Sequence, residues 1–130
     1  MGKAGPRTLV LDAGALIAFE RGDSRMRALV REALSLAARI IVPAGALGQV
    51  WRQPARQVRL GALLNGPTSS VLPLDQPLAE ASGILCGRSE TSDVIDASVV
   101  LTARRVNGVI LTGDSGDLRR LDATVPLERI

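Results

Sequence analysis

The chain has 130 residues, a formal charge of +3 and no histidine, and 46% of its residues are hydrophobic although only 2% are aromatic. We expect a single α/β domain over residues 1–130, with an aliphatic core. Cys86 is the only cysteine, so an internal disulfide is excluded, and catalysis by a histidine base is excluded as well. No apolar run approaches the roughly 20 residues that span a bilayer. No signal-peptide pattern opens the sequence either, so we expect a cytoplasmic protein.

The first half of the sequence predicts strands that alternate with helices. Residues 1–7 are polar, and we expect this end to be frayed. Continuous apolar runs predict strands of a parallel sheet that is covered on both faces, and apolar stripes at helical spacing predict the helices. The expected elements are a strand at 9–11, helices at 13–20 and 24–38, a strand at 40–42, and a helical pattern from 44 to about 64. Pro54 interrupts the last pattern and predicts a kink or two helices.

The second half of the sequence continues the alternation after a turn at Asn65-Gly66-Pro67. The expected elements are a strand at 70–74, a helix at 76–86, a polar loop at 87–92, a helix at 93–107, a strand at 109–112, a helix at 115–121 and a strand at 125–127. Asn107-Gly108 is typical of a helix C-cap. The whole pattern predicts a central parallel sheet of four to five strands flanked by helices.

Four aspartates are expected at one edge of this sheet. Asp12 and Asp114 follow the strands at 9–11 and 109–112, and sites in open α/β sheets form outside the carboxyl ends of the strands. Asp93 and Asp96 are three residues apart in the first turn of a helix, so they share one face. Two carboxylates about 5 Å apart repel by roughly 3 kcal/mol at an effective dielectric near 20. A divalent cation would offset this repulsion, so the sequence favours a Mg²⁺ or Mn²⁺ site.

Structural roles for some of these residues stay open at this point. Asp93 is also a candidate for the N-cap of its helix, and Asp114 for a turn residue in Thr112-Gly-Asp-Ser-Gly-Asp. For Asp117 we favour a role as a helix cap or a solvated residue over a role as a metal ligand. Asp12 is the hardest to explain by structure alone, because it directly follows a buried strand.

Three motifs in this order resemble those of a PIN domain: Leu9-Val-Leu-Asp-Ala-Gly-Ala-Leu16, Asp93-Val-Ile-Asp-Ala97 and Ile110-Leu-Thr-Gly-Asp114. Within that superfamily the chain is most similar to VapC-type toxins of bacterial VapBC toxin–antitoxin pairs. The resemblance implies a three-layer PIN-like fold and a Mg²⁺- or Mn²⁺-dependent ribonuclease. It also implies a homodimer, and a VapB-type antitoxin as partner.

The resemblance assigns roles to particular side chains. Asp12, Asp96 and Asp114 are the implied metal ligands, and Asp93 matches an additional acidic position of the catalytic site found in some relatives. Thr112 is the implied small hydroxyl residue that orients water or a ligand.

Two positions depart from the family pattern. Gln49 stands where many relatives have a glutamate, so the site lacks one negative charge, and we expect weaker metal binding or compensation by Asp93. Gly14 stands where many relatives have a serine. A catalytically inactive member is therefore one possible outcome.

The functional hypothesis is hydrolysis of RNA phosphodiester bonds by metal-activated water, leaving 5′-phosphate and 3′-hydroxyl ends. Arg52, Arg56 and Arg59 recur at helical spacing and predict a basic stripe that holds the RNA backbone, although a solvated helix face explains them too. For Trp51 we favour a packing or dimer contact over a role in stacking against a base.

Other classes of protein with aspartates at strand ends fit the sequence less well. A haloacid-dehalogenase-type phosphatase needs a second aspartate at the position of Gly14, and a receiver domain needs a lysine after its last strand, where none exists. Two alternatives stay open: a PIN-type nuclease that acts on DNA, and a catalytically weak PIN-like binding module.

Overall fold

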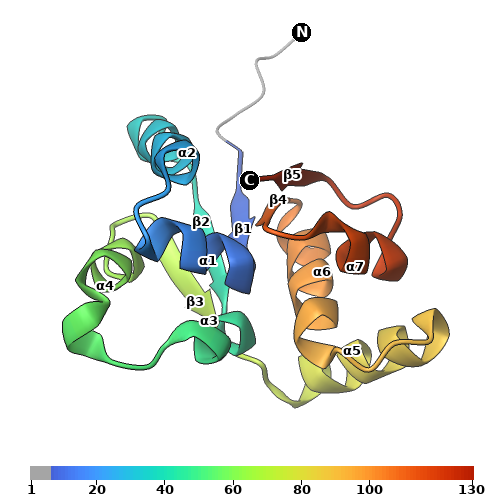
Figure 1. Ribbon diagram of the computed structural model, residues 1–130. Helices are drawn as coiled ribbons and strands as arrows, with labels where there is room; N and C mark the ends of the chain where they lie inside the picture. The colour runs from blue at the N-terminus through green and yellow to red at the C-terminus, as the bar shows by residue number, and fades with distance from the viewer. Residues whose placement is uncertain (1–6) are drawn as a thin grey trace, which may run out of the picture.

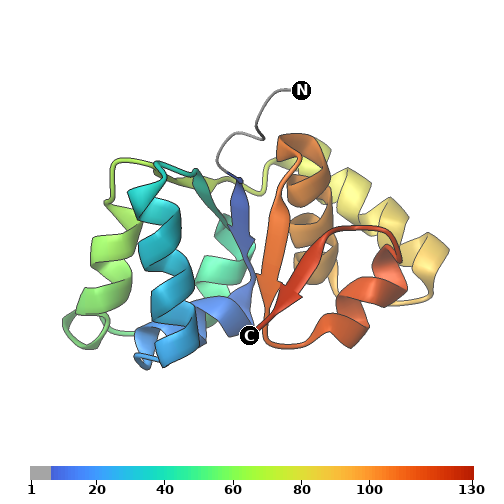
Figure 2. The same cartoon turned by 90° about the horizontal axis from the view of Figure 1, so that it is seen from above.

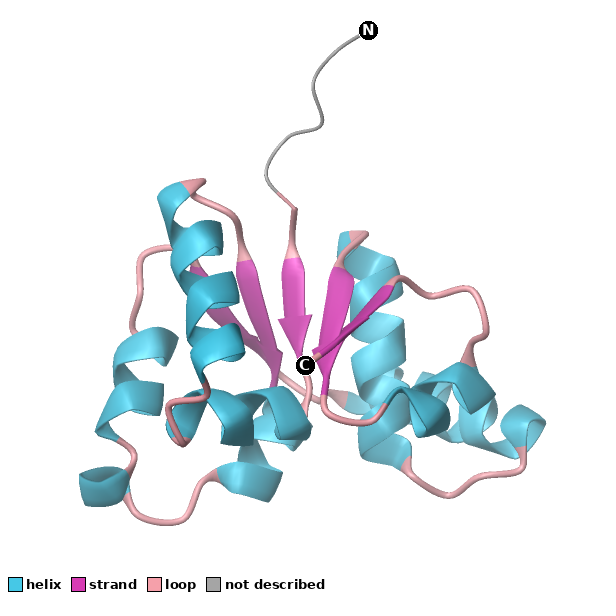
Figure 3. Ribbon diagram, turned by 45° about the horizontal axis from the view of Figure 1, so that its top comes forward, coloured by secondary structure: helices cyan, strands magenta, loops and turns pink. Residues whose placement is uncertain are grey.

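A five-stranded parallel sheet forms the centre of the computed structural model, which describes residues 7–130. The strand order is β3-β2-β1-β4-β5, and each neighbouring pair is parallel. The strands are β1 (Leu9–Leu11), β2 (Ile40–Pro43), β3 (Ser69–Leu72), β4 (Val109–Thr112) and β5 (Leu127–Arg129). Because all the strands are parallel, their carboxyl ends meet at one edge of the sheet, where the arrowheads in Figure 3 point.

Helices flank the sheet on both sides, which gives the α/β architecture expected from the sequence (Figure 1). Residues 7–130 contain α1 (Ala13–Glu20), α2 (Ser24–Ser35), α3 (Ala44–Val50), the 3-10 helix η1 (Pro54–Arg56), α4 (Val58–Leu64), α5 (Gln76–Ser89), α6 (Val94–Val106) and α7 (Ser115–Leu121). Figure 2 shows α1 to α4 gathered beside β2 and β3, and α5 to α7 beside β4 and β5. No helix in this described part is long and apolar enough to cross a membrane.

The core is aliphatic, as the composition predicts. All residues of β1 and β2 are buried, and α6 packs against β1, β2 and β4. Helix α3 approaches α6 closely, since a Cβ atom added at Gly45 would lie 2.6 Å from Cδ1 of Ile95. Cys86 is buried and packs as a small core residue.

Several element boundaries differ from the sequence-based prediction. Helix α2 ends at Ser35 and not at residue 38, since Ala37 is left-handed with φ 54°, and its N-cap is Asp23. Helix α5 continues to Ser89, so the polar loop expected from residue 87 begins later, with Glu90 at φ 55°. Strand β5 occupies Leu127–Arg129, slightly after the expected 125–127. The frayed start expected at residues 1–7 lies, except for residue 7, outside the described residues.

The break expected at Pro54 is confirmed, and the side chain of Gln57 stabilises it. Helix α3 ends at Val50, and Gln57 is only 4% exposed. Its Oε1 accepts hydrogen bonds from the backbone N–H groups of Arg52 (2.7 Å) and Gln53 (3.1 Å), and its Nε2 donates to the carbonyl oxygen of Val50 (3.0 Å). One amide therefore pairs with a carbonyl at the end of α3 and with two N–H groups in the break that follows.

We expect Gln57→Ala to lower the free energy of unfolding by about 2–3 kcal/mol, because it leaves those backbone groups without partners. Urea denaturation followed by circular dichroism measures the effect. The matched control is Gln53→Ala, whose side chain is exposed and which should change stability by less than about 0.5 kcal/mol. Equal effects of the two variants would contradict this role of Gln57.

Candidate functional site

Asp12 is the most deeply placed acidic residue at the carboxyl edge of the sheet. It follows β1, is 7% exposed, and caps α1 by accepting a hydrogen bond from the backbone N–H of Ala15 (2.9 Å). Burial raises the pKa of its carboxyl group above the usual 3.8, while the Thr112 hydroxyl and the backbone N–H groups of Ala15, Gly113 and Gly14 act in the opposite direction. The chain thus holds a carboxylate in a place where its charge is only partly compensated.

Asp93 and Asp96 lie together in the first turn of α6. Asp93 is the N-cap, and its Oδ1 accepts a hydrogen bond from the backbone N–H of Asp96 (2.9 Å). Burial raises the pKa of Asp96 from 3.8 to about 7, with further contributions from Asp93 and from the charges of Asp12 and Asp117. The charges that raise this pKa come from the N-terminal ends of α1, α6 and α7. Asp93 combines the capping role and a place in the acidic cluster, which the sequence had offered as alternatives.

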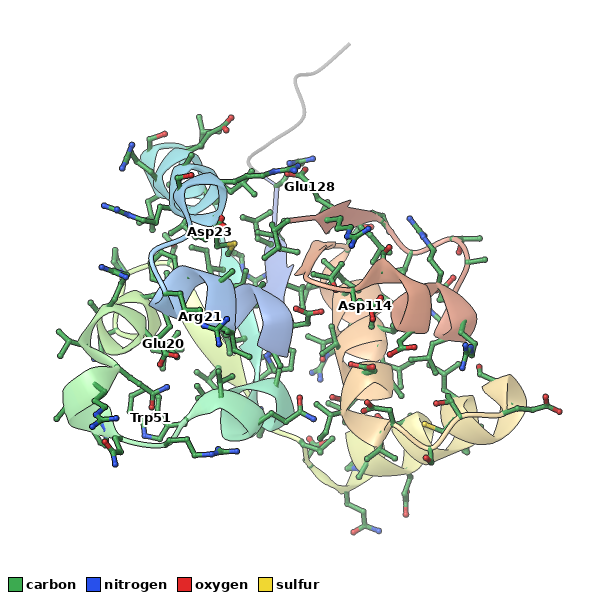
Figure 4. All side chains as sticks on the ribbon, in the orientation of Figure 1. Glu20, Arg21, Asp23, Trp51, Asp114 and Glu128 are labelled. Carbon is green, nitrogen blue, oxygen red and sulfur yellow. The ribbon has the colours of Figure 1, made fainter. Side chains whose placement is uncertain are left out.

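The carboxyl end of β4 contributes Thr112, Asp114 and Asp117. Thr112 is fully buried, and its hydroxyl accepts a hydrogen bond from the N–H of Asp114 (3.0 Å) and donates to the carbonyl of the same residue (3.0 Å). The carboxylate of Asp114 caps α7 by accepting from the N–H of Gly116 (3.0 Å), and Figure 4 shows it at the start of α7. The charge of Asp117, in the first turn of α7, is one of those that raise the pKa of Asp96.

No ion pair within residues 7–130 involves this acidic cluster, which we define as Asp12, Asp93, Asp96 and Asp117. The ion pairs found there are Arg7–Glu128 and Arg104–Asp122. Arg104, which lies on the last turn of α6, joins Thr124 in lowering the pKa of Asp122 to about 2. No basic side chain of residues 7–130 therefore forms an ion pair with the cluster.

The donor set of the cluster fits a hard divalent cation, because all its side chains offer carboxylate oxygens. Within the described residues no group of three Asp, Glu, His or Cys side chains is arranged so that it could hold a metal ion by itself. Mg²⁺ does not need such a cage, since it keeps several waters and binds through one or two carboxylates together with substrate phosphates. The chain therefore fits a cation held by few direct ligands.

The positions that depart from the family pattern take distinct places in the structure. Gln49 is exposed on α3, one helical turn after Gly45, which faces Ile95 next to Asp96. Gly14 lies against Gly113, and a Cβ atom added to Gly14 would be 3.0 Å from the backbone nitrogen of Gly113. The two glycines let the β1–α1 and β4–α7 turns approach each other, so a serine at position 14 would crowd this contact.

A family comparison now identifies the chain. The model of the PIN domain matches residues 9–123, which include every member of the acidic cluster. The chain belongs to the PIN-domain family. No curated protein is significantly similar to it in sequence.

Several solved structures share this fold. The PIN domain is similar to a chain of VapBC2 from Rickettsia felis bound to a promoter DNA fragment, with a TM-score of 0.71, 13% identity, and coverage of 95% of this chain and 98% of that one. It is also similar to a chain of FitAcB from Neisseria gonorrhoeae, with a TM-score of 0.65, 16% identity, and coverage of 92% and 96%. A third match is a chain of FitAB bound to the IR36 DNA fragment, with a TM-score of 0.65, 14% identity and 94% coverage of both chains. These likenesses establish the PIN-like fold.

The predicted stripe of Arg52, Arg56 and Arg59 does not form on one helix, because the chain breaks at Pro54. Arg52 follows α3 and Arg56 lies in η1. Together with Glu20, both line an open pocket of about 390 Å³. Figure 4 labels Glu20 and the nearby Trp51. Arg59 lies on α4, and its Nη1 donates to the carbonyl oxygen of Glu20 (2.8 Å). Arg59 thus faces a different pocket, where it meets Arg27 and Arg31 of α2.

Arg27 and Arg31 were not expected from the sequence to form a site, although their four-residue spacing on a helix is a usable signal. Gln57 was not expected to have a role either, since all its hydrogen-bond partners are backbone groups and leave no local pattern in the sequence.

Stability of the metal-free PIN domain should fall as pH rises from about 4.5 to 8. Asp96 binds its proton more tightly in the folded state, so its contribution is fully present at low pH and is lost as pH rises through about 7. We expect a loss of roughly 1–2 kcal/mol from this half-buried group, after allowance for solvent screening. Urea denaturation in EDTA at pH 5 and pH 8 measures it.

The variant Asp96→Asn cannot ionise and is the matched comparison. We expect it to be more stable than the wild type at pH 8 and to show a weaker dependence on pH. The same pH dependence in both proteins would show that the loss of stability at high pH does not come from ionisation of Asp96.

Proposed function

We propose that this PIN domain is a Mg²⁺- or Mn²⁺-dependent endoribonuclease, a VapC-type toxin of a toxin–antitoxin pair that acts in the cytoplasm. The observation that carries the proposal is the group of carboxylates of Asp12, Asp93, Asp96 and Asp117 at the carboxyl edge of the sheet, none of which pairs with a basic side chain within residues 7–130. Burial and the neighbouring carboxylates accordingly raise the pKa of Asp96. Natural proteins keep such unfavourable charge arrangements mainly at functional sites.

Asp12 and Asp96 are the proposed direct ligands of the cation. Asp12 is held in place by the N-terminus of α1, and Asp96 by the first turn of α6, so neither carboxylate depends on a mobile loop. Asp93, Asp114 and Asp117 add negative charge or bind the cation through water, and Thr112 keeps the β4–α7 turn next to Asp12. Near neutral pH, Asp96 holds a proton that cation binding would displace, so metal affinity should rise with pH.

The chemistry follows from what the chain contains and from what it lacks. A bound divalent cation supplies a water of lowered pKa and offsets charge that develops on the phosphate. The chain has no histidine, so a metal-free acid–base mechanism based on histidine is not available. The proposed reaction is hydrolysis of an RNA phosphodiester, leaving 5′-phosphate and 3′-hydroxyl ends.

The proposed partners are RNA, a VapB-type antitoxin and a second copy of the chain. Support for the antitoxin comes from the VapBC2 and FitAB complexes, whose chains share this fold. Support for a protein contact comes from Trp51, which lines an open apolar groove of about 370 Å³ between α3 and α4. Arg52 and Arg56 are proposed to contact RNA phosphates from the pocket that they share with Glu20.

We expect Asp12→Asn and Asp96→Asn each to reduce Mn²⁺-dependent RNA cleavage by at least about 100-fold, because each removes a proposed ligand. The measurement is cleavage of a structured RNA and of single-stranded DNA over a Mn²⁺ titration. Glu80→Gln, an exposed change on α5, is the charge-matched control and should retain wild-type rates. Wild-type rates in both aspartate variants would contradict the assignment. Equal cleavage of DNA would favour a DNA nuclease, and no cleavage by the wild type would favour a binding module.

Gln49→Glu should tighten Mn²⁺ binding by roughly tenfold, because it restores the negative charge that many relatives carry at this position. Isothermal titration of the wild type and the variant with Mn²⁺ measures the change, and Gln49→Ala tests the role of the amide. Unchanged affinity in Gln49→Glu would mean that this exposed position of α3 does not contribute to the site.

A further inference from the structure

A second basic surface lies between α2 and α4, on the opposite end of α1 from Asp12. It is an open pocket of about 320 Å³ that we call the arginine pocket, lined by Phe19, Arg27, Val30, Arg31, Leu34 and Arg59. Arg27 and Arg31 come from successive turns of α2, and Arg59 comes from α4. Three positive charges thus meet over an apolar floor, and no acidic side chain lines the pocket.

Contacts with the turn after α1 fix the position of Arg59 in the arginine pocket. The guanidinium of Arg59 donates to the carbonyl oxygen of Glu20 (2.8 Å) and lies over Gly22, where an added Cβ atom would be 2.8 Å from Nη1. Gly22 has φ +79°, a conformation that glycine adopts readily, so the turn after α1 leaves room for this arginine.

The charge of the arginine pocket is not neutralised within residues 7–130. Neither ion pair of this part of the chain includes Arg27, Arg31 or Arg59. Like charges four residues apart destabilise a helix by about 0.2–0.5 kcal/mol, so the arrangement of Arg27 and Arg31 brings no benefit to α2 itself. A bound polyanion would offset this repulsion.

Helix α1 connects the arginine pocket with the acidic cluster. Asp12 caps its first turn, while Phe19 and Glu20 form its last turn, and Figure 1 shows α1 crossing between α6 and α7 on one side and α2 and α4 on the other. The 8 residues of α1 span about 12 Å at 1.5 Å per residue. This length corresponds to three or four nucleotides at about 3.4 Å per stacked nucleotide.

We propose that the arginine pocket is a binding site for the RNA strand, three or four nucleotides from the phosphate that is cleaved. The proposal rests on the proposed function, because it takes the acidic cluster as the place of cleavage. Arg27 and Arg31 contact phosphates, and Phe19, the only phenylalanine of the chain, offers an apolar face to a base. The pocket would raise affinity for RNAs long enough to reach it and leave shorter ones unaffected.

The test compares the full-length wild type with the double variant Arg27→Ala/Arg31→Ala. Fluorescence anisotropy in EDTA measures binding of labelled single-stranded RNAs of 4 and 12 nucleotides, without cleavage, over a range of salt concentrations. The variant should bind the 12-mer on the order of tenfold more weakly, and its salt slope should be smaller by about 1.4, since each single-strand phosphate contact contributes about 0.7. Binding of the 4-mer should not change.

The matched control is Arg25→Ala/Arg88→Ala, which removes the same charge from exposed positions outside the pocket. An equal loss of affinity in the control would show that only net charge matters and would overturn the proposal. An unchanged salt slope in the pocket variant would overturn it as well. Binding of poly-glutamate that the pocket variant loses, with RNA binding intact, would assign the pocket to an acidic protein segment instead.

Cleavage assays separate this inference from the proposed function. With Mn²⁺, the pocket variant should show a raised KM for the 12-mer and an unchanged kcat. If the wild type cleaves RNA and the variant has the same KM, the pocket proposal fails while the nuclease proposal stands. If the wild type does not cleave RNA, the proposed function fails, and the pocket proposal fails with it.

Discussion

The buried carboxylate of Asp12 is the constraint on which the rest of the site depends. It ends the central strand β1, caps α1, and lies beside the β4–α7 turn through Thr112 and Gly113. Its burial is unfavourable for a charged group, and the charges of Asp93 and Asp117 around Asp96 add to that cost. The fold tolerates this arrangement because the first turns of α1 and α6 donate backbone N–H groups to Asp12 and Asp93. The N-termini of α1 and α6, which hold Asp12 and Asp93 by these hydrogen bonds, both lie at the carboxyl edge of the sheet.

Charge is separated along the molecule, although the net charge of +3 conceals it. The acidic cluster lies where α1 begins, and Arg27, Arg31 and Arg59 gather where α1 ends. A polyanion that approaches a cation at the acidic edge would be attracted to the arginine end and repelled from bare carboxylates. A bound cation should therefore favour entry of the polyanion into the acidic edge, while the arginine end attracts it with or without the cation.

The departures from the family pattern have a common physical consequence. Gln49 contributes no charge, and Asp114 uses its carboxylate to cap α7, while Asp117 acts on Asp96 from the first turn of the same helix. The negative charge at this edge thus comes from the N-terminal ends of α1, α6 and α7, and none comes from α3. Gly14 and Gly113 pack backbone against backbone, so the close approach of the two turns takes the place of a serine hydroxyl.

The sequence by itself determined the order of strands and helices, the aliphatic core and the carboxylates at the strand ends. These features follow from local periodicity, from the rule for parallel sheets and, for Asp12, Asp93 and Asp96, from motifs that lie on single elements. Only the tertiary structure decided which side chains meet across elements. It separated Arg59 from Arg52 and Arg56, because the break at Pro54 turns the chain, and it joined Arg59 to Arg27 and Arg31. It also gave Gln57 its role and brought Asp117 near Asp96, because such contacts depend on how α3, α6 and α7 pack and leave no periodic trace along the chain.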